Sequence, residues 1–153
     1  GSMPERFLWD SHVNNAAAQN ACFEHLFDSL TGLMETLAAT SGPSGGTLLD
    51  TTMVLVLSEM GRTPVENAGA GKDHWPTTSA MLVGAGVEGA QVLGATNDTL
   101  SGIPIDMNSG EASGSGQTLT AAHLLAGVLA GFDVDPGDSF PGIDPFTAPF
   151  ETT

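Results

Sequence analysis

A continuous apolar run, TMVLVL at residues 52–57, limits the fold more than any other part of the sequence. Its length and its branched side chains are typical of a strand buried on both faces, as in a mostly parallel sheet. A second apolar run predicts another strand at residues 79–83, and short strands are expected near residues 91–93 and 103–105. Two clear strands are few for a complete sheet, so we expect the sheet to need strands from elsewhere.

Two helices are expected beside these strands. Over residues 14–39 apolar side chains recur every three or four positions, and Asn14 or Asn15 can cap the first turn. Residues 119–130 form a second apolar segment of helical length, with Thr118 or Thr120 as its cap. The resulting order of helix, strand, loop, strands and helix predicts the α/β class.

The end of the chain has a different character. It is rich in Pro, Gly and Asp beyond residue 133, and Phe140, Phe146 and Phe150 are the expected anchors onto the body of the protein. The segment GEASGSGQ at residues 110–117 is low in complexity and is expected to be mobile.

The charge excludes several functional classes. The 153 residues include 3 Lys and Arg against 18 Asp and Glu, which gives a formal net charge of −15. A nucleic-acid reader needs a basic surface, and an anionic membrane surface would repel this chain, so we expect neither partner. No apolar run approaches the roughly 20 residues of a membrane span. The single cysteine, Cys22, excludes an internal disulfide and a cysteine-rich zinc module.

The scarce positive charge is concentrated after the first strand. Arg62 and Lys72 are two of the three cations, and Glu59, Asp73 and His74 lie in the same loop region. Open α/β sheets bind ligands at the carboxyl ends of their strands, so this grouping predicts an anion site. The alternative is that both cations only offset neighbouring acids in an exposed loop.

A second polar cluster, WDSHVNN, comes directly before the first helix. Asp10 and His12 can reach one metal ion if the backbone is extended there, but a capping Asp and a hydrogen-bonded His explain the pair equally well. Elsewhere, His25 follows Cys22 by three residues and fits an ordinary half-buried helix position better than a zinc ligand. His123, at the start of the last helix, is expected to be a core or capping residue.

The segments WDSHVNN, LVLSEMGRTP and GKDHWP together resemble the bacterial domain-of-unknown-function 1501 family, within the alkaline-phosphatase and sulfatase superfamily. The resemblance runs from about Phe7 to Pro136 and includes AMLVGAGVEGAQVLGAT and LTAAHLLAGVLAGFDVDP. It implies part of an alkaline-phosphatase-like sheet with flanking helices, incomplete in this chain. Residues 1–3 then form a cloning scar, residues 4–136 the C-terminal half of the domain, and residues 137–153 a Pro-, Gly- and Phe-rich tail.

The resemblance also implies metal-dependent hydrolysis of phosphate or sulfate esters. It makes Arg62 and Lys72 the cations that face the anion. The candidate metal ligands are Asp10, His12, Glu59, Asp73 and His74. The chain departs from the superfamily at the second metal, because the usual Asp-His pair after the buried strand is replaced by Glu59 and Met60.

One carboxylate and two imidazoles are the typical ligands of a catalytic zinc, so zinc is the expected cofactor, with manganese or calcium as alternatives. Such a metal lowers the pKa of bound water and polarises an ester oxygen, while nearby cations stabilise developing charge. The expected partners are a phosphate- or sulfate-containing small molecule and the missing N-terminal half, in the same or a separate chain. We expect this chain alone to be inactive, and the family implies a periplasmic or secreted location.

Two other interpretations remain open at this point. A non-catalytic protein on the same fold could keep an anion or metal site without turnover. A structural protein could use its acidic surface and Phe-rich tail for assembly onto another chain.

Overall fold

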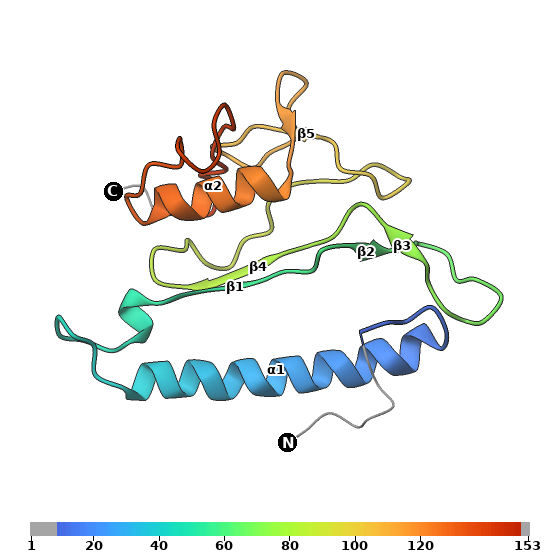
Figure 1. Cartoon of the computed structure of the whole chain (residues 1–153), viewed down its shortest axis with the longest axis horizontal. Helices are drawn as coiled ribbons and strands as arrows, with labels where there is room; N and C mark the ends of the chain where they lie inside the picture. Colours follow the sequence, from blue (N-terminus) through green and yellow to red (C-terminus); the bar gives the residue numbers. More distant parts are fainter. Residues whose placement is uncertain (1–8, 151–153) are drawn as a thin grey trace. The chain divides into compact units, whose positions relative to one another are not determined.

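A computed structural model describes residues 9–150, and it is a mixed α/β structure with two helices and several short strands (Figure 1). The elements in chain order are α1 (Asn15–Ala39), the 3₁₀ turn η1 (Leu49–Thr51), β1 (Met53–Val56), β2 (Gly61–Arg62), β3 (His74–Trp75), β4 (Met81–Gly84), β5 (Pro104–Ile105), β6 (Gln117–Thr118) and α2 (Ala121–Gly131). Within residues 9–150, none of the helices has the length and apolar character that would let it cross a membrane.

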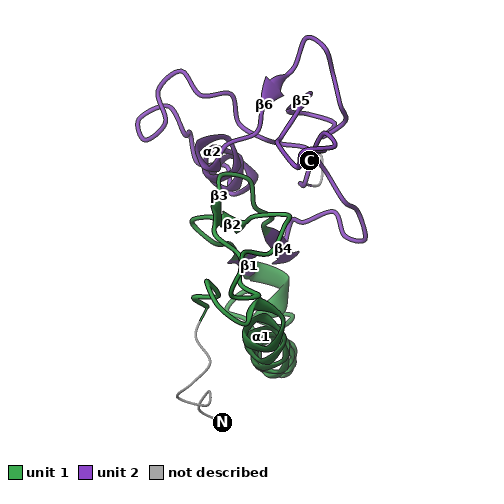
Figure 2. Cartoon of the chain, turned by 90° about the vertical axis from the view of Figure 1, so that its right-hand side faces the viewer, with its two compact units in different colours: residues 1–52, 56–80 green, residues 53–55, 81–153 purple. Residues whose placement is uncertain are grey.

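The strands pair two by two. β1 pairs with β4, β2 pairs with β3 in antiparallel fashion, and β5 pairs with β6, again antiparallel. Contacts divide the chain into two compact units: residues 1–52 with 56–80, and residues 53–55 with 81–153 (Figure 2). The α/β class is therefore confirmed, while the larger alkaline-phosphatase-like sheet stays a prediction.

The first unit contains α1, which confirms the helix expected at residues 14–39. Its burial differs from the expectation, because its two buried residues are Ala18 and Cys22. Phe23 and Phe27, which belong to the expected apolar stripe, are 44% and 52% exposed. Phe23 packs edge-on against Trp9 with ring centroids 5.1 Å apart. The regular apolar spacing therefore predicts the helix correctly, but the apolar stripe of the helix is only partly buried.

The start of α1 is capped differently from the prediction. Asn14 holds the N-cap position in a left-handed conformation (φ 53°), and its side chain makes no capping hydrogen bond. Instead, the backbone amides of Asn14 and Asn15 donate to the carbonyls of Gly69 and Ala70, at 3.2 and 2.8 Å. The first amides of a helix need acceptors from outside it. Here a distant loop supplies two of them.

The second unit has its core around Ile105, Met107 and Phe146, with Leu93, Leu119, Leu124 and Ala148 packed against it. Thr120 and His123 form a capping box at the start of α2. This confirms Thr120 as the cap and His123 as a capping residue, which is also buried. Among the expected anchors of the tail, Phe146 and Phe150 are buried and Phe140 is half-buried.

Several expectations about strands need correction. Residues 91–93 do not form a strand, whereas β5 confirms the strand expected near residues 103–105. β1 and β4 confirm the two apolar strands, but their residues are half-buried rather than enclosed on both faces. The strands β2, β3 and β6 were not predicted, because strands of two residues are too short to show any periodicity.

Candidate functional site

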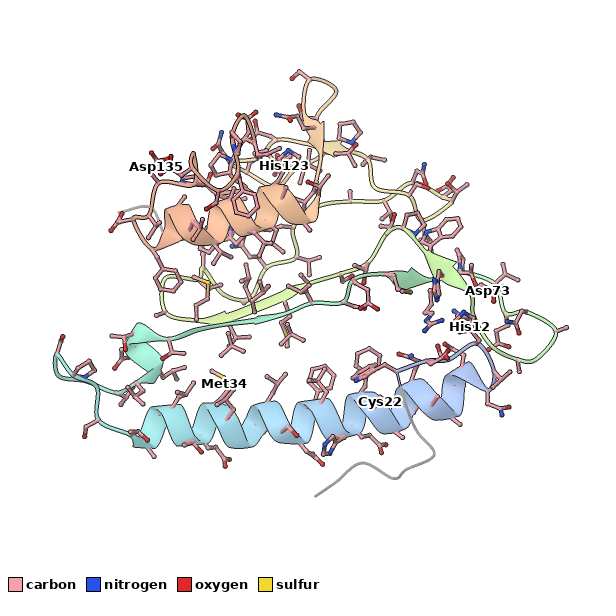
Figure 3. All side chains as sticks on the ribbon, in the orientation of Figure 1. His12, Cys22, Met34, Asp73, His123 and Asp135 are labelled. Carbon is pink, nitrogen blue, oxygen red and sulfur yellow. The ribbon has the colours of Figure 1, made fainter. Side chains whose placement is uncertain are left out.

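Two segments that are distant in the sequence, residues 9–15 and 62–74, lie side by side in the first unit (Figure 3). The amide of Lys72 donates to the carbonyl of Ser11 at 2.9 Å, which adds to the two bonds at the start of α1. Gly71 makes this approach sterically feasible, since a Cβ there would lie 1.9 Å from the carbonyl oxygen of His12. The contact between the segments is therefore close and made largely by backbone.

The contact brings two histidines together. In the β2–β3 pair Arg62 lies opposite His74. The loop between these two strands therefore places His74 beside the segment that contains His12. The imidazole rings of His12 and His74 have centroids 4.8 Å apart with their planes inclined by 52°. Both residues are exposed. The site thus offers two neighbouring imidazoles that solvent and ligands can reach.

Asp10 fixes the orientation of His12. Its carboxylate Oδ1 contacts Nδ1 of the His12 ring and accepts a 3.1 Å hydrogen bond from the His12 amide. These two hydrogen bonds hold the pKa of Asp10 below its ordinary value, the ring contact being the larger cause, with a smaller contribution from Arg62. An ionised carboxylate can only accept, so Nδ1 of His12 carries the proton. In the neutral ring the lone pair is then on Nε2.

Arg62 joins the two segments through its guanidinium group. Nη1 donates to the carbonyl of Lys72 at 3.1 Å, and Nη2 donates to the carbonyl of Trp9 at 3.3 Å. Nη2 also lies 3.8 Å from Oδ1 of Asp10. Nη1 lies 3.4 Å from Nδ1 of His12, and because Nδ1 carries a proton this is a contact between two donors and not a hydrogen bond. Arg62 therefore places positive charge beside the imidazole while holding the segments together.

The other predicted site residues, Asp73, Lys72 and Glu59, differ in whether they contact this cluster. Asp73 belongs to it through Asn67, whose Nδ2 donates to Oδ1 of Asp73 at 3.2 Å. Lys72 joins it through its backbone, and its side chain is half-exposed. Glu59 is exposed and accepts a hydrogen bond from its neighbour Ser58, so its described contacts are local. The structure thus brings together the Asp10–His12 pair and the loop after β2, but not Glu59.

Sequence reasoning missed Asn67, which connects both segments. Its Nδ2 donates to the carbonyl of His12 at 3.0 Å as well as to Asp73. An asparagine among glycines, as in NAGAG, is typical of a turn in which the side chain binds the backbone. That local signal gives no indication of the contact with His12, 55 residues away.

The cluster fits part of a metal site. Over residues 9–150, no group of three or more His, Cys, Asp or Glu side chains is arranged to hold one metal ion. The two imidazoles are suitable ligands, and a carboxylate on Nδ1 of a histidine is the usual outer partner of a metal-binding ring. Asp10 fits that supporting role better than a ligand role. The metal assignments of Glu59 and Asp73 stay predictions.

Comparison with known proteins identifies a family that this sequence resembles. A family model described as "Protein of unknown function (DUF1501)" matches residues 2–106. Neither the curated proteins nor the solved structures gave a match to this chain.

Proposed function

This chain belongs to the DUF1501 family, a family of unknown function, and we propose that it provides a metal- and anion-binding site for the hydrolysis of phosphate or sulfate esters. The observation that carries the proposal is the adjacent imidazole pair of His12 and His74, with Asp10 on the inner nitrogen of His12 and Arg62 beside it. An exposed carboxylate, two exposed imidazoles and a half-buried guanidinium from two distant segments form one cluster. Such a group can bind a cation and an anion next to each other.

Each residue has a distinct role in this proposal. His12 would bind a divalent ion through Nε2, and His74 would provide the second imidazole. Asp10 keeps the proton of His12 on Nδ1 and so directs the lone pair outward. Arg62 and Lys72 supply positive charge that favours a phosphate or sulfate group. When bound, zinc, or alternatively manganese or calcium, would lower the pKa of water and polarise an ester oxygen.

Two imidazoles are fewer than the three protein ligands of a typical catalytic zinc. We propose that the remaining ligand comes from a segment outside residues 9–150, in the same or a separate chain. The substrate would be a small molecule with a phosphate or sulfate ester. A periplasmic or secreted location rests on the family resemblance alone.

Zinc binding by the purified chain tests the proposal. We expect His74→Ala to weaken zinc binding at least about 10-fold in equilibrium dialysis, since even the loss of an outer partner of a metal ligand costs about that much. His25→Ala is the matched control, because His25 is a half-buried histidine of α1 outside the cluster. Equal zinc affinity in wild type and His74→Ala would refute the assignment.

Anion binding is tested separately with Lys72→Ala. Lys72 is the better choice than Arg62, because its hydrogen bonds to Ser11 and Arg62 use only its backbone and survive the substitution. Calorimetry with inorganic sulfate and phosphate should show weaker binding by Lys72→Ala. Unchanged affinity for both anions would remove Lys72 from the proposed site.

A non-catalytic binding protein is the second candidate. It is favoured by Arg62, since both terminal nitrogens of its guanidinium already contact backbone carbonyls. Because this chain alone is expected to be inactive, hydrolysis of an aryl phosphate and an aryl sulfate is measured with the zinc- or manganese-loaded chain together with the segment that provides the remaining ligand, and it separates the two candidates. Turnover that disappears in His74→Ala supports the hydrolase, whereas bound metal without turnover supports the binding protein.

A further inference from the structure

We infer that Asn67 is a positioning residue that fixes His12 in place beside His74. This inference rests on the proposed function, because it assigns a supporting residue to the same imidazole pair. The hydrogen bonds of the Asn67 side chain go to backbone groups and to Asp73. Asn67 acts on the backbone of His12 and on the loop that leads to His74.

Asn67 first closes its own loop. Its Oδ1 accepts hydrogen bonds from the amides of Gly69 and Gly71, at 2.9 and 3.1 Å. Its backbone amide donates to the carbonyl of Gly71 at 2.8 Å, and its carbonyl accepts from Ala70 at 3.1 Å. The carbonyl side of the amide is thus used entirely within the loop, which gives residues 67–71 a fixed shape.

The other side of the amide group faces outward from this loop. Nδ2 donates both to the carbonyl of His12 and to Oδ1 of Asp73, at 3.0 and 3.2 Å. An amide NH₂ has two donors, so these two contacts use its full capacity. One side chain therefore connects the loop to the His12 segment and to the residue directly before His74.

The base of the loop transmits this constraint to His74. Thr63 and Asp73 are joined by two hydrogen bonds, from the amide of Thr63 to the carbonyl of Asp73 at 2.9 Å and from the amide of Asp73 to Oγ1 of Thr63 at 3.1 Å. The next pair in the register is Arg62 with His74. His12 and His74 are therefore held on either side of a continuous set of hydrogen bonds that passes through Asn67.

The substitution Asn67→Asp isolates the donor function. The new carboxylate keeps acceptor oxygens for the amides of Gly69 and Gly71, so the turn is retained. It cannot donate to the carbonyl of His12, and it places a second negative charge against Asp73. An added negative charge by itself would attract a cation. A fall in zinc affinity therefore reports displacement of the loop or of His12, through the lost hydrogen bonds and the repulsion from Asp73, and not a direct effect of the new carboxylate on zinc.

Asn97 provides a matched control in the second unit. Its Oδ1 accepts from the amides of Thr99 and Ser101, at 3.0 and 3.1 Å. Its backbone bonds to Ser101 and Leu100 repeat those of Asn67 to Gly71 and Ala70. Asn97→Asp thus makes the same chemical change in the same kind of turn, but at a turn that does not belong to the His12 cluster.

The experiment compares wild type, Asn67→Asp and Asn97→Asp in two measurements. The first is zinc affinity by titration, read from the NMR signals of the His12 and His74 rings. We expect Asn67→Asp to lose about 10- to 100-fold in affinity, the usual effect of removing a residue that orients a metal ligand, while Asn97→Asp stays within about two-fold of wild type. The second is the nuclear Overhauser effect between the two rings in the metal-free protein, which should weaken only in Asn67→Asp.

The outcomes separate this inference from the proposed function. Unchanged ring contact and unchanged zinc affinity in Asn67→Asp would overturn the positioning role. Another outcome combines two results: Asn67→Asp loses the ring contact, and the wild type does not bind zinc through His12 and His74. This outcome would support the positioning role and refute the metal site. Equal losses in Asn67→Asp and Asn97→Asp would mean that the effect is a general one of the substitution, and would also overturn the inference.

Discussion

Replacing Gly71 with alanine would force apart the two segments that form the site. A Cβ at this position would lie 1.9 Å from the carbonyl oxygen of His12, 2.1 Å from its carbonyl carbon and 2.5 Å from the amide nitrogen of Val13. All three are backbone atoms, so no side-chain rotation can relieve the overlap. Ordinary contact between heavy atoms begins at roughly 3.5 Å, so the loop must move away from the His12 segment by about 1.5 Å.

Such a shift breaks the hydrogen bonds between the segments. The bonds from Lys72 to Ser11 and from Asn67 to His12 are 2.9 and 3.0 Å long. A shift of about 1.5 Å would lengthen both to about 4.5 Å, well beyond hydrogen-bonding range. Each bond stabilises the fold by about 1 kcal/mol, and the two bonds at the start of α1 would weaken as well. The gross loss is therefore about 2–4 kcal/mol. Alanine also lowers the conformational entropy of the unfolded chain, which stabilises the folded protein by about 0.4–1 kcal/mol. The net loss in the free energy of unfolding is therefore about 1–3 kcal/mol.

Urea unfolding followed by far-ultraviolet circular dichroism measures this loss, with Gly69→Ala as the control. A Cβ at position 69 meets the Cγ1 atom of Val13 at 3.3 Å, and that side chain is 63% exposed and free to move. Gly69→Ala should therefore stay within about 1 kcal/mol of wild type. If both variants had the same free energy of unfolding, the close backbone approach at Gly71 would be refuted.

Three further predictions follow from particular contacts. The pKa of Asp10 is lowered in the folded state by its hydrogen bonds with His12, so its contribution to stability is present above the ordinary carboxyl pKa of about 4 and is lost as the pH falls through the lower folded value. Asp10→Asn should flatten the acid limb of stability against pH, and an unchanged limb would contradict the Asp10–His12 contact. Gly127→Ala in α2 should destabilise by about 1–3 kcal/mol, because its Cβ would lie 2.1 Å from the carbonyl oxygen of Phe146, and urea unfolding with no loss would show that the helix lies farther from that segment. Gly32→Ala in α1 should raise the free energy of unfolding by about 0.5–1 kcal/mol, since nothing lies within 4 Å of the added carbon, and a loss would mean that an unseen contact covers this face.

The sequence indicated the longer elements because their patterns are local. Periodic apolar residues located α1 and α2, and the runs at residues 52–57 and 79–83 located β1 and β4. The cap at Thr120 was also identified, since an N-cap is set by residues close in sequence. Residues 91–93 contain only two apolar side chains and do not form a strand, and Val92 is 97% exposed, because a short segment becomes a strand only where a partner lies beside it.

The contacts within the site could not be predicted from the spacing of residues along the sequence. Asp10, His12, Arg62 and His74 were nominated from two separate segments, and their convergence was expected only from the family resemblance. Their contacts depend on hydrogen bonds between groups more than 50 residues apart, as in the bond from the Asn67 side chain to the carbonyl of His12. Asn67 was not identified because its turn looks the same in sequence as many others. The turn at Asn97 has the same backbone bonds and the same type of bonds from amides to Oδ1, yet it lies in the other unit.

Locating zinc by anomalous diffraction, in crystals of this protein soaked with zinc, is the most direct test of the proposed metal site. We predict an ion about 2.0–2.1 Å from Nε2 of His12 and at the same distance from a ring nitrogen of His74, with Asp10 retained on Nδ1 of His12. An ion bound to one of these rings without the other, an ion at other residues, or the absence of an ion at saturating zinc would contradict the site.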